Sequence, residues 1–200
     1  MIAEPAAKSG VEDTRNRILA ATRELYAGNG SRGTTTREVA LRAGVNEATV
    51  FRHFGTKGQL LRAMLDHYSA ISALPEMLER VRSLGTIEEQ LRELGLSCIE
   101  AVKRREDLIK VSMAEELNNP EGHTCAWQAP TAARIRLGEY FAEQVDAGIL
   151  CGEPQFLARV FMSLFFAFVM ARKIWTGFDS APENAVNNLV GIFLNGARAR

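Results

Sequence analysis

The stretch "REVALRAGVNEATVFRHF", from Arg37 to Phe54, contains two short helical patterns that meet at Gly44. Val39, Val45 and Val50 recur where two packed helices share an interior, and a glycine between the patterns permits the positive φ of a sharp turn. This arrangement predicts a helix-turn-helix, whose second helix has the size and polarity to enter the major groove of DNA. A plain helical hairpin with a solvated polar face fits the same pattern, and both interpretations stay open at this point.

The length, composition and charge of the chain give the context for this motif. The chain has 200 residues, 46% of them hydrophobic, and its formal net charge is zero. Residues 1–67 hold ten Lys or Arg against seven Asp or Glu, and between Ser31 and Arg62 six basic residues face two acidic ones. Such a local excess attracts phosphate weakly. Three widely spaced cysteines without a C-x-x-C motif, and a first segment without an apolar core, indicate a reducing, cytoplasmic compartment.

Helical periodicity continues through almost the whole sequence, and alternating strand patterns are nearly absent. We therefore expect an all-α fold of about nine helices. The expected helices begin near Asp13, Thr36, Asn46, Lys57, Ile87, Asp107, Thr131, Pro154 and Pro182, with Pro75 either interrupting the fourth helix or starting another.

The run "VFMSLFFAFVMA", Val160 to Ala171, is the most apolar part of the chain. A bilayer span needs about 20 apolar residues. This run is shorter, so we expect a buried helix that ends near Gly177, and no membrane partner.

Residues 14–68, and above all "TTTREVALRAGVNEATVFRHFGTKGQLLRAML", resemble the N-terminal domain of TetR-family transcriptional regulators. The shared features are a threonine-led helix at Thr35 or Thr36, the A-x-x-A-G-V turn from Ala40 to Val45, and an aromatic-rich recognition helix from Thr49 to Phe54. The entry F-x-x-K-x-x-L-L into the next helix follows, from Phe54 to Leu61.

The resemblance implies that double-stranded DNA with a pseudo-palindromic operator is the main partner. The implied contacts are with phosphates or with the major groove, and the residues are Thr36, Arg37, Asn46, Glu47, Ala48, Thr49, Phe51, Arg52, His53 and Lys57. The family often has tyrosine where this chain has Phe51, so a phenolic hydrogen bond to phosphate is in doubt, whereas contact with a sugar or a thymine methyl group remains. Glu47 fits either a contact with cytosine or an acid that favours the helix N-terminus.

The resemblance also implies a division into a tail (1–12), a DNA-binding domain (13–58), a connecting helix (59–75) and a domain that binds an effector and dimerises (76–200). A homodimer would pair the last two helices of each subunit in a four-helix bundle, through Phe156, Val160, Leu164, Val186, Leu189, Val190, Phe193 and Leu194. From the residues alone, a monomer with one central apolar helix is the alternative. Candidate contacts for an apolar or aromatic small molecule, each of which also fits core packing, are Met113, Leu117, Trp127, Phe141, Phe161, Phe165, Phe168, Arg172 and Trp175.

No pattern indicates catalysis, a cofactor or a metal. The adjacent acid pairs Glu88-Glu89 and Glu115-Glu116 point in different directions on a helix, and phosphate-binding glycine motifs are missing. His123 and Cys125 have no further ligand nearby. The prediction is a DNA-binding regulator, a repressor released by a small molecule. The alternative is a small-molecule-binding or carrier module that no longer reads DNA.

Overall fold

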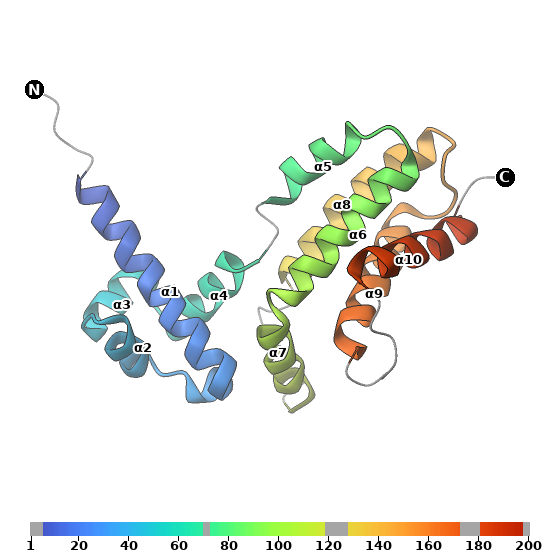
Figure 1. The fold of residues 1–200 in the computed structure, drawn as a ribbon. Coiled ribbons are helices and arrows are strands. Elements are labelled where there is room, and N and C mark those ends of the chain that lie inside the picture. Colours follow the sequence, from blue (N-terminus) through green and yellow to red (C-terminus); the bar gives the residue numbers. More distant parts are fainter. Residues whose placement is uncertain (1–5, 70–72, 119–127, 173–180, 198–200) are drawn as a thin grey trace, which may run out of the picture. The chain divides into compact units, whose positions relative to one another are not determined.

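The computed structural model describes residues 6–69, 73–118, 128–172 and 181–197, and in this part of the chain every regular element is a helix. The all-α prediction is confirmed, and the described ranges contain ten helices in the order shown in Figure 1. They are α1 (Ala6–Gly33), α2 (Thr36–Ala43), α3 (Glu47–Phe54), α4 (Lys57–His67), α5 (Leu74–Arg82), α6 (Ile87–Lys103), α7 (Glu106–Asn118), α8 (Gln128–Asp146), α9 (Pro154–Ala171) and α10 (Pro182–Ala197).

Several helix ends differ from the sequence expectation. α1 begins at Ala6, earlier than the expected start near Asp13. The connecting helix does not run to about residue 74, because α4 ends at His67 and a separate helix, α5, begins at Leu74. Pro75 lies in the first turn of α5, where its missing N–H breaks no helical hydrogen bond. α9 ends at Ala171, before the expected end near Gly177.

The helices form two compact units, and the chain passes between them more than once. The first unit contains α1 to α4 together with α7 from Asp107 onward, and the second contains α5, α6, α8, α9 and α10. The expected second domain began at residue 76 and included α7. Leu108 of α7 is instead fully buried in the core of the first unit, which explains the different partition.

Polar contacts also join α7 to α1 within the first unit. The Tyr26 hydroxyl donates to Glu115 at 2.9 Å and lies 3.1 Å from the Ser112 hydroxyl. Glu115 also accepts from the backbone N–H of Ser31, directly after the kink that Gly30 makes with a φ of 65°. The buried part of α7 is thus fixed to the segment that leads into α2.

An aromatic cluster forms the centre of the second unit. The rings of Phe161 and Phe165 lie 4.8 Å apart, and Phe161 also contacts Phe141 at 5.7 Å and Phe193 at 5.2 Å. The pairs of Phe161 with Phe141 and Phe193 are edge-to-face, a geometry that adds to the free energy gained by burial. α6 approaches closely at Gly95, where a Cβ atom would stand 2.6 Å from Cζ of Phe165.

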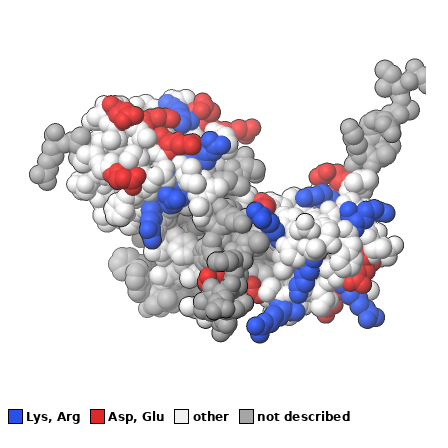
Figure 2. All heavy atoms as spheres, turned by 180° about the vertical axis from the view of Figure 1, so that it is seen from behind, with Lys and Arg blue, Asp and Glu red and all other residues white. Residues whose placement is uncertain are grey.

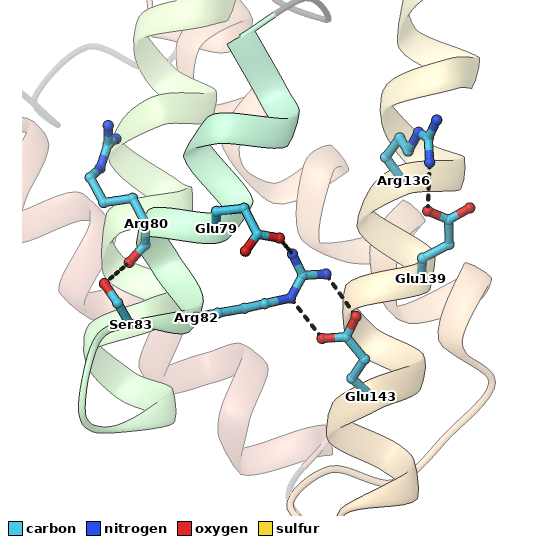
Figure 3. Close-up of polar contacts among 7 residues, drawn as sticks. All are labelled: Glu79, Arg80, Arg82, Ser83, Arg136, Glu139 and Glu143. Carbon is cyan, nitrogen blue, oxygen red and sulfur yellow. Dashed lines mark hydrogen bonds and ion pairs between the residues drawn. The ribbon is translucent and has the colours of Figure 1, made fainter.

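Ion pairs tie α5 to α8 at the surface of the second unit (Figure 3). Arg82 donates to both carboxylate oxygens of Glu143, at 2.7 and 2.9 Å, and to Glu79 at 2.8 Å. The hydrogen bond from Arg82 lowers the pKa of Glu143 below its ordinary value, and the same bond raises the pKa of Arg82. Both side chains keep substantial exposure, so we expect a modest contribution to stability.

α9 is long and apolar enough to cross a membrane by the criteria of length and composition, and it is the one such helix in the described ranges. A central helix of a folded core meets the same criteria. In this chain, Phe161, Phe165 and Val169 of α9 are fully buried in the second unit.

Candidate nucleic-acid interface

Backbone caps define both ends of α2. At its start, the Thr35 hydroxyl oxygen accepts from the Glu38 N–H at 3.2 Å, which satisfies one of the free donors of the first turn. At its end, Gly44 adopts the left-handed conformation with φ 66° and ψ 39°. The Val45 N–H reaches back to the Ala40 carbonyl at 3.0 Å, as in a Schellman turn. The glycine turn predicted from the sequence is therefore present.

α3 is held in the same way. Asn46 caps it, because its side-chain oxygen accepts from both the N–H and the hydroxyl of Thr49 at 2.8 Å. Val50 and Phe54 are buried in the core of the first unit. The opposite side of the helix is exposed and consists of Glu47, Ala48, Phe51 and Arg52. A rigid helix thus presents one acidic, one small, one aromatic and one basic side chain to solvent.

The two helices are also linked at their N-terminal ends. The Thr36 hydroxyl donates to the Glu47 carboxylate at 2.6 Å. The only proton of this hydroxyl is therefore used inside the protein. Glu47 has a partner beyond the helix N-terminus, which neither sequence interpretation of this residue included.

The remaining predicted DNA contacts lie on the same small set of elements. Arg37 is exposed in the first turn of α2, and His53 is half-buried at the end of α3 beside the Phe54 ring. Lys57 is the first residue of α4, where Thr56 and Gln59 form a capping box. The free N–H groups of such a first turn favour an anion.

The charge on this unit is mixed. On the face that Figure 2 shows, basic side chains are spread over the N-terminal unit among acidic ones, without one continuous basic surface. Within the described residues, no group of three or more His, Cys, Asp or Glu side chains is arranged to hold a metal ion. The chemistry available at α3 is therefore hydrogen bonding, apolar contact and local positive charge.

The predicted ligand-contact residues that the structure describes lie on α7 of the first unit, and on α8 and α9 or directly after α9 in the second unit. Phe141, Phe161 and Phe165 are fully buried against one another, and Phe168 is half-buried beside their cluster. Met113 and Leu117 lie exposed on α7, which belongs to the first unit. Trp127 and Trp175 lie outside the described residues.

Arg172 is also engaged, since its guanidinium pairs with Glu106 at 2.5 Å and donates to the Val169 carbonyl at 3.2 Å. An anionic ligand at Arg172 would have to compete with Glu106.

The predicted dimer residues divide into two groups. Four of them are buried in the core of their own protomer, namely Val186, Val190, Phe193 and Leu194. The other four keep exposed surface: Phe156 is 60% exposed, and Val160, Leu164 and Leu189 are half-buried. Ile192 of α10, which the sequence interpretation did not include, is 64% exposed. Its neighbour Phe193 fits the apolar stripe of α10 equally well. The sequence pattern alone does not show which of the two side chains faces the core.

A second omission concerns polar side chains on other helices that contact the turn and its surroundings. Arg17 of α1 donates to the backbone of the α2–α3 turn, and Glu115 of α7 contacts the start of the α1–α2 connection. Neither contact follows from local spacing, because the partners are 27 and 84 residues apart in the chain.

Comparisons with known proteins agree with this architecture. The family model described as "Bacterial regulatory proteins, tetR family" matches residues 18–64, and the model "AefR-like transcriptional repressor, C-terminal domain" matches residues 89–195. The HTH-type transcriptional regulator YvkB of Bacillus subtilis is 32% identical over 160 residues, which cover 80% of this chain and 82% of that protein.

Two further relatives extend the comparison. An HTH-type transcriptional repressor of Mycobacterium tuberculosis is 48% identical over 87 residues, which span 44% of this chain and 45% of that protein. A crystal structure of a TetR-family regulator from Mesorhizobium loti superimposes with a TM-score of 0.76 at 18% identity, covering 94% of this chain and 98% of that one. The fold, the helix-turn-helix and the two matching family models lead to one conclusion: this chain belongs to the TetR family of bacterial transcriptional regulators.

Proposed function

We propose that the protein is a homodimeric repressor whose two α3 helices enter successive major grooves of a pseudo-palindromic operator in the cytoplasm. The observation that carries this proposal is the exposed face of Glu47, Ala48, Phe51 and Arg52 on a helix that is capped at its start and buried on its other side. A two-fold dimer places such helices about 34–36 Å apart, the distance of one turn of DNA.

Each exposed group suits a particular contact. Arg52 offers a guanidinium that pairs with the O6 and N7 atoms of guanine or with phosphate. Phe51, which is 47% exposed, offers an apolar ring to a thymine methyl group or a sugar. Lys57 and His53 would bind backbone phosphates, with support from the first turn of α4. For Thr36, whose proton is donated to Glu47, a phosphate contact would use the backbone N–H instead.

The dimer would form through the apolar residues that the protomer leaves exposed on α9 and α10. Phe156, Val160 and Leu164 recur at four-residue intervals on one side of α9, and Leu189 and Ile192 lie three residues apart on α10. Burial of these side chains against a second copy removes apolar surface from water. A two-fold interface uses the same patch on both subunits.

An apolar or aromatic effector would act on the second unit. Half-buried Phe168, which packs beside the buried aromatic cluster around Phe161 and Phe165, offers an apolar aromatic contact of the kind that such a ligand prefers. To release the operator, the effector must bind one conformation of the dimer more tightly than the other, and coupling of about 1–3 kcal/mol is typical.

The direct test is DNA binding. Duplexes are selected by the wild-type protein from a random-sequence pool, and affinity is then measured at fixed salt for wild type and for Arg52→Ala. If Arg52 reads a base pair, its removal weakens binding by about 1–3 kcal/mol in each half-site. Arg80→Ala, which removes an exposed arginine of the second unit, serves as the matched control. Equal affinity of Arg52→Ala and wild type contradicts the proposed role.

A further inference from the structure

Arg17 lies on α1, outside the helix-turn-helix, and yet its guanidinium contacts the backbone of the turn. Nη2 donates to the Ala43 carbonyl and, at 3.2 Å, to the Gly44 carbonyl. These are the last residue of α2 and the glycine that ends this helix. The Asp13 carboxylate, one turn earlier on α1, lies 3.9 Å from Nη1. The side chain therefore connects α1 directly to the peptide groups that redirect the chain between α2 and α3.

The position suits a cation for a physical reason. The last carbonyls of a helix have no partner inside it and carry partial negative charge, so a guanidinium there supplies both hydrogen bonds and favourable charge. Gly44 contributes twice. It adopts a φ of 66°, and it leaves space for Arg17, since a Cβ atom at this position would lie 2.9 Å from Nη2.

The turn is close enough to α3 to set its direction. Only Val45 and Asn46 separate Gly44 from Glu47, the first residue of α3. A second contact, the hydrogen bond from Thr36 to Glu47, joins the first residue of α2 to the first residue of α3. The contacts of Arg17 with the turn and the hydrogen bond between Thr36 and Glu47 both restrain the angle between the two helices.

We propose that Arg17 is a positioning residue for operator recognition, which fixes the α2–α3 turn and thereby the orientation in which α3 meets the major groove. The inference rests on the proposed function, because it presupposes that α3 reads DNA. The competing role is direct contact with a phosphate, since the Arg17 side chain retains 47% of its exposure. The two roles differ in specificity and in salt dependence. A phosphate contact strengthens binding to every sequence, whereas correct orientation matters most for the specific one.

The experiment compares Arg17→Met, Arg17→Lys and wild type on a duplex that the wild-type protein selects from a random pool, and on a scrambled duplex of equal length. Arg42→Met is the matched control. It removes one positive charge from the same unit and breaks a 2.8 Å contact between α2 and Glu24 of α1, without touching the turn. Affinities are measured over a series of salt concentrations.

We expect Arg17→Met to bind the selected duplex about tenfold more weakly, because two recognition helices act on one operator and a roughly threefold loss at each multiplies. Binding to the scrambled duplex and the salt slope should stay close to the wild-type values. Arg17→Lys should recover part of the loss, since it returns a cation to the helix end. Arg42→Met should keep the wild-type ratio between the two affinities.

A measurement without DNA supports the same comparison. The amide protons of Gly44 and Val45, which donate to carbonyls of α2, should exchange faster in Arg17→Met than in Arg42→Met. If Arg17→Met does not fold, Arg17→Lys alone must show a reduced ratio of selected to scrambled binding.

Two results overturn the inference. One is unchanged affinity and exchange in the Arg17 variants. The other is an equal proportional loss on both duplexes with a salt slope lower by about two per dimer, which identifies a phosphate contact in each protomer. If the wild-type protein selects no duplex at all, the proposed function itself fails, and the inference fails with it.

Discussion

The pair α2–α3 and the pair α9–α10 are held together in opposite ways. α2 and α3 have eight residues each, are capped by Thr35 and Asn46, and join through a left-handed glycine. α9 and α10 have 18 and 16 residues and meet through aromatic rings, with Phe161 and Phe193 5.2 Å apart. The short pair is held by caps near in sequence and by polar contacts such as that of Arg17 with the turn, whereas the long pair depends on apolar packing. The comparison predicts that equivalent changes in the two pairs will have different consequences.

The largest effect is expected at two neighbouring residues of α10. Phe193→Asp places a carboxylate in the aromatic cluster, where the wild-type side chain is only 5% exposed. The lost packing and the buried charge should cost at least about 3–5 kcal/mol and abolish cooperative folding. Ile192→Asp changes an exposed residue and should leave the protomer folded while it weakens the dimer. Circular dichroism with sedimentation velocity measures both properties.

Each variant serves as the control for the other. A folded, dimeric Phe193→Asp protein would contradict the assignment of this ring to the core. A fully dimeric Ile192→Asp protein would remove Ile192 from the proposed interface.

One glycine in each unit gives the next contrast. Gly95→Ala brings a methyl group against the Phe165 ring, which should lower the free energy of unfolding by about 1–3 kcal/mol. The higher helix propensity of alanine should offset part of this loss. Gly44→Ala forces alanine to a φ of 66°, at a cost of about 1–2 kcal/mol. Asparagine tolerates this conformation but is larger. Chemical denaturation should therefore show that the Asn variant is more stable than the Ala variant at position 44 and less stable than the Ala variant at position 95. The same order at both positions would mean that the two glycines are needed for the same reason.

These cases show what the sequence could and could not predict. Gly44, Asn46 and the buried Val50 were predicted because caps, turns and helical periodicity are encoded within a few residues. The apolar character of α10 was also clear, but its inward side was not, because Phe193 and Ile192 are adjacent and both apolar. The packing of α7 with α1 depends on partners such as Tyr26 and Glu115, which are 89 residues apart. No local sequence pattern could therefore predict it.

The caps provide a smaller effect. Asn46→Ala removes the side-chain acceptor at the start of α3 and should destabilise the protein by about 1 kcal/mol. Asn46→Asp keeps an acceptor and should retain stability, yet its negative charge beside DNA phosphates should weaken operator binding. Glu153→Ala is the matched change in the long pair, since Glu153 caps α9 through the Gln155 and Phe156 N–H groups. Thermal unfolding should show a smaller loss there, because packing along 18 residues holds α9 in place. Equal losses at the two caps would undermine the contrast between the pairs.

The smallest effect concerns the surface of the second unit. The pKa of Glu143 is lowered by its hydrogen bond with Arg82, so the pair stabilises the fold above the ordinary carboxyl pKa and loses this contribution as pH falls through the lowered value. Glu143→Gln should cost less than about 1 kcal/mol at neutral pH, and the difference from wild type should vanish in acid. Urea denaturation at several pH values measures it. Glu139→Gln removes a single 3.2 Å contact on α8 and should change the stability less. If the stability difference between Glu143→Gln and wild type stays constant down to low pH, the ion pair is not its source.

The course of the chain through α7 has a consequence for engineering this regulator. The polypeptide leaves the first unit after α4, builds α5 and α6, and returns with α7 to complete a core that contains Leu108. A hybrid that joins residues 1–69 to the sensor of another protein would therefore leave Tyr26 and the Ser31 amide without their natural acceptor at Glu115. A transfer of the first unit to another protein should therefore include α7 together with the N-terminal helices, since this unit is built from two separate segments of the chain.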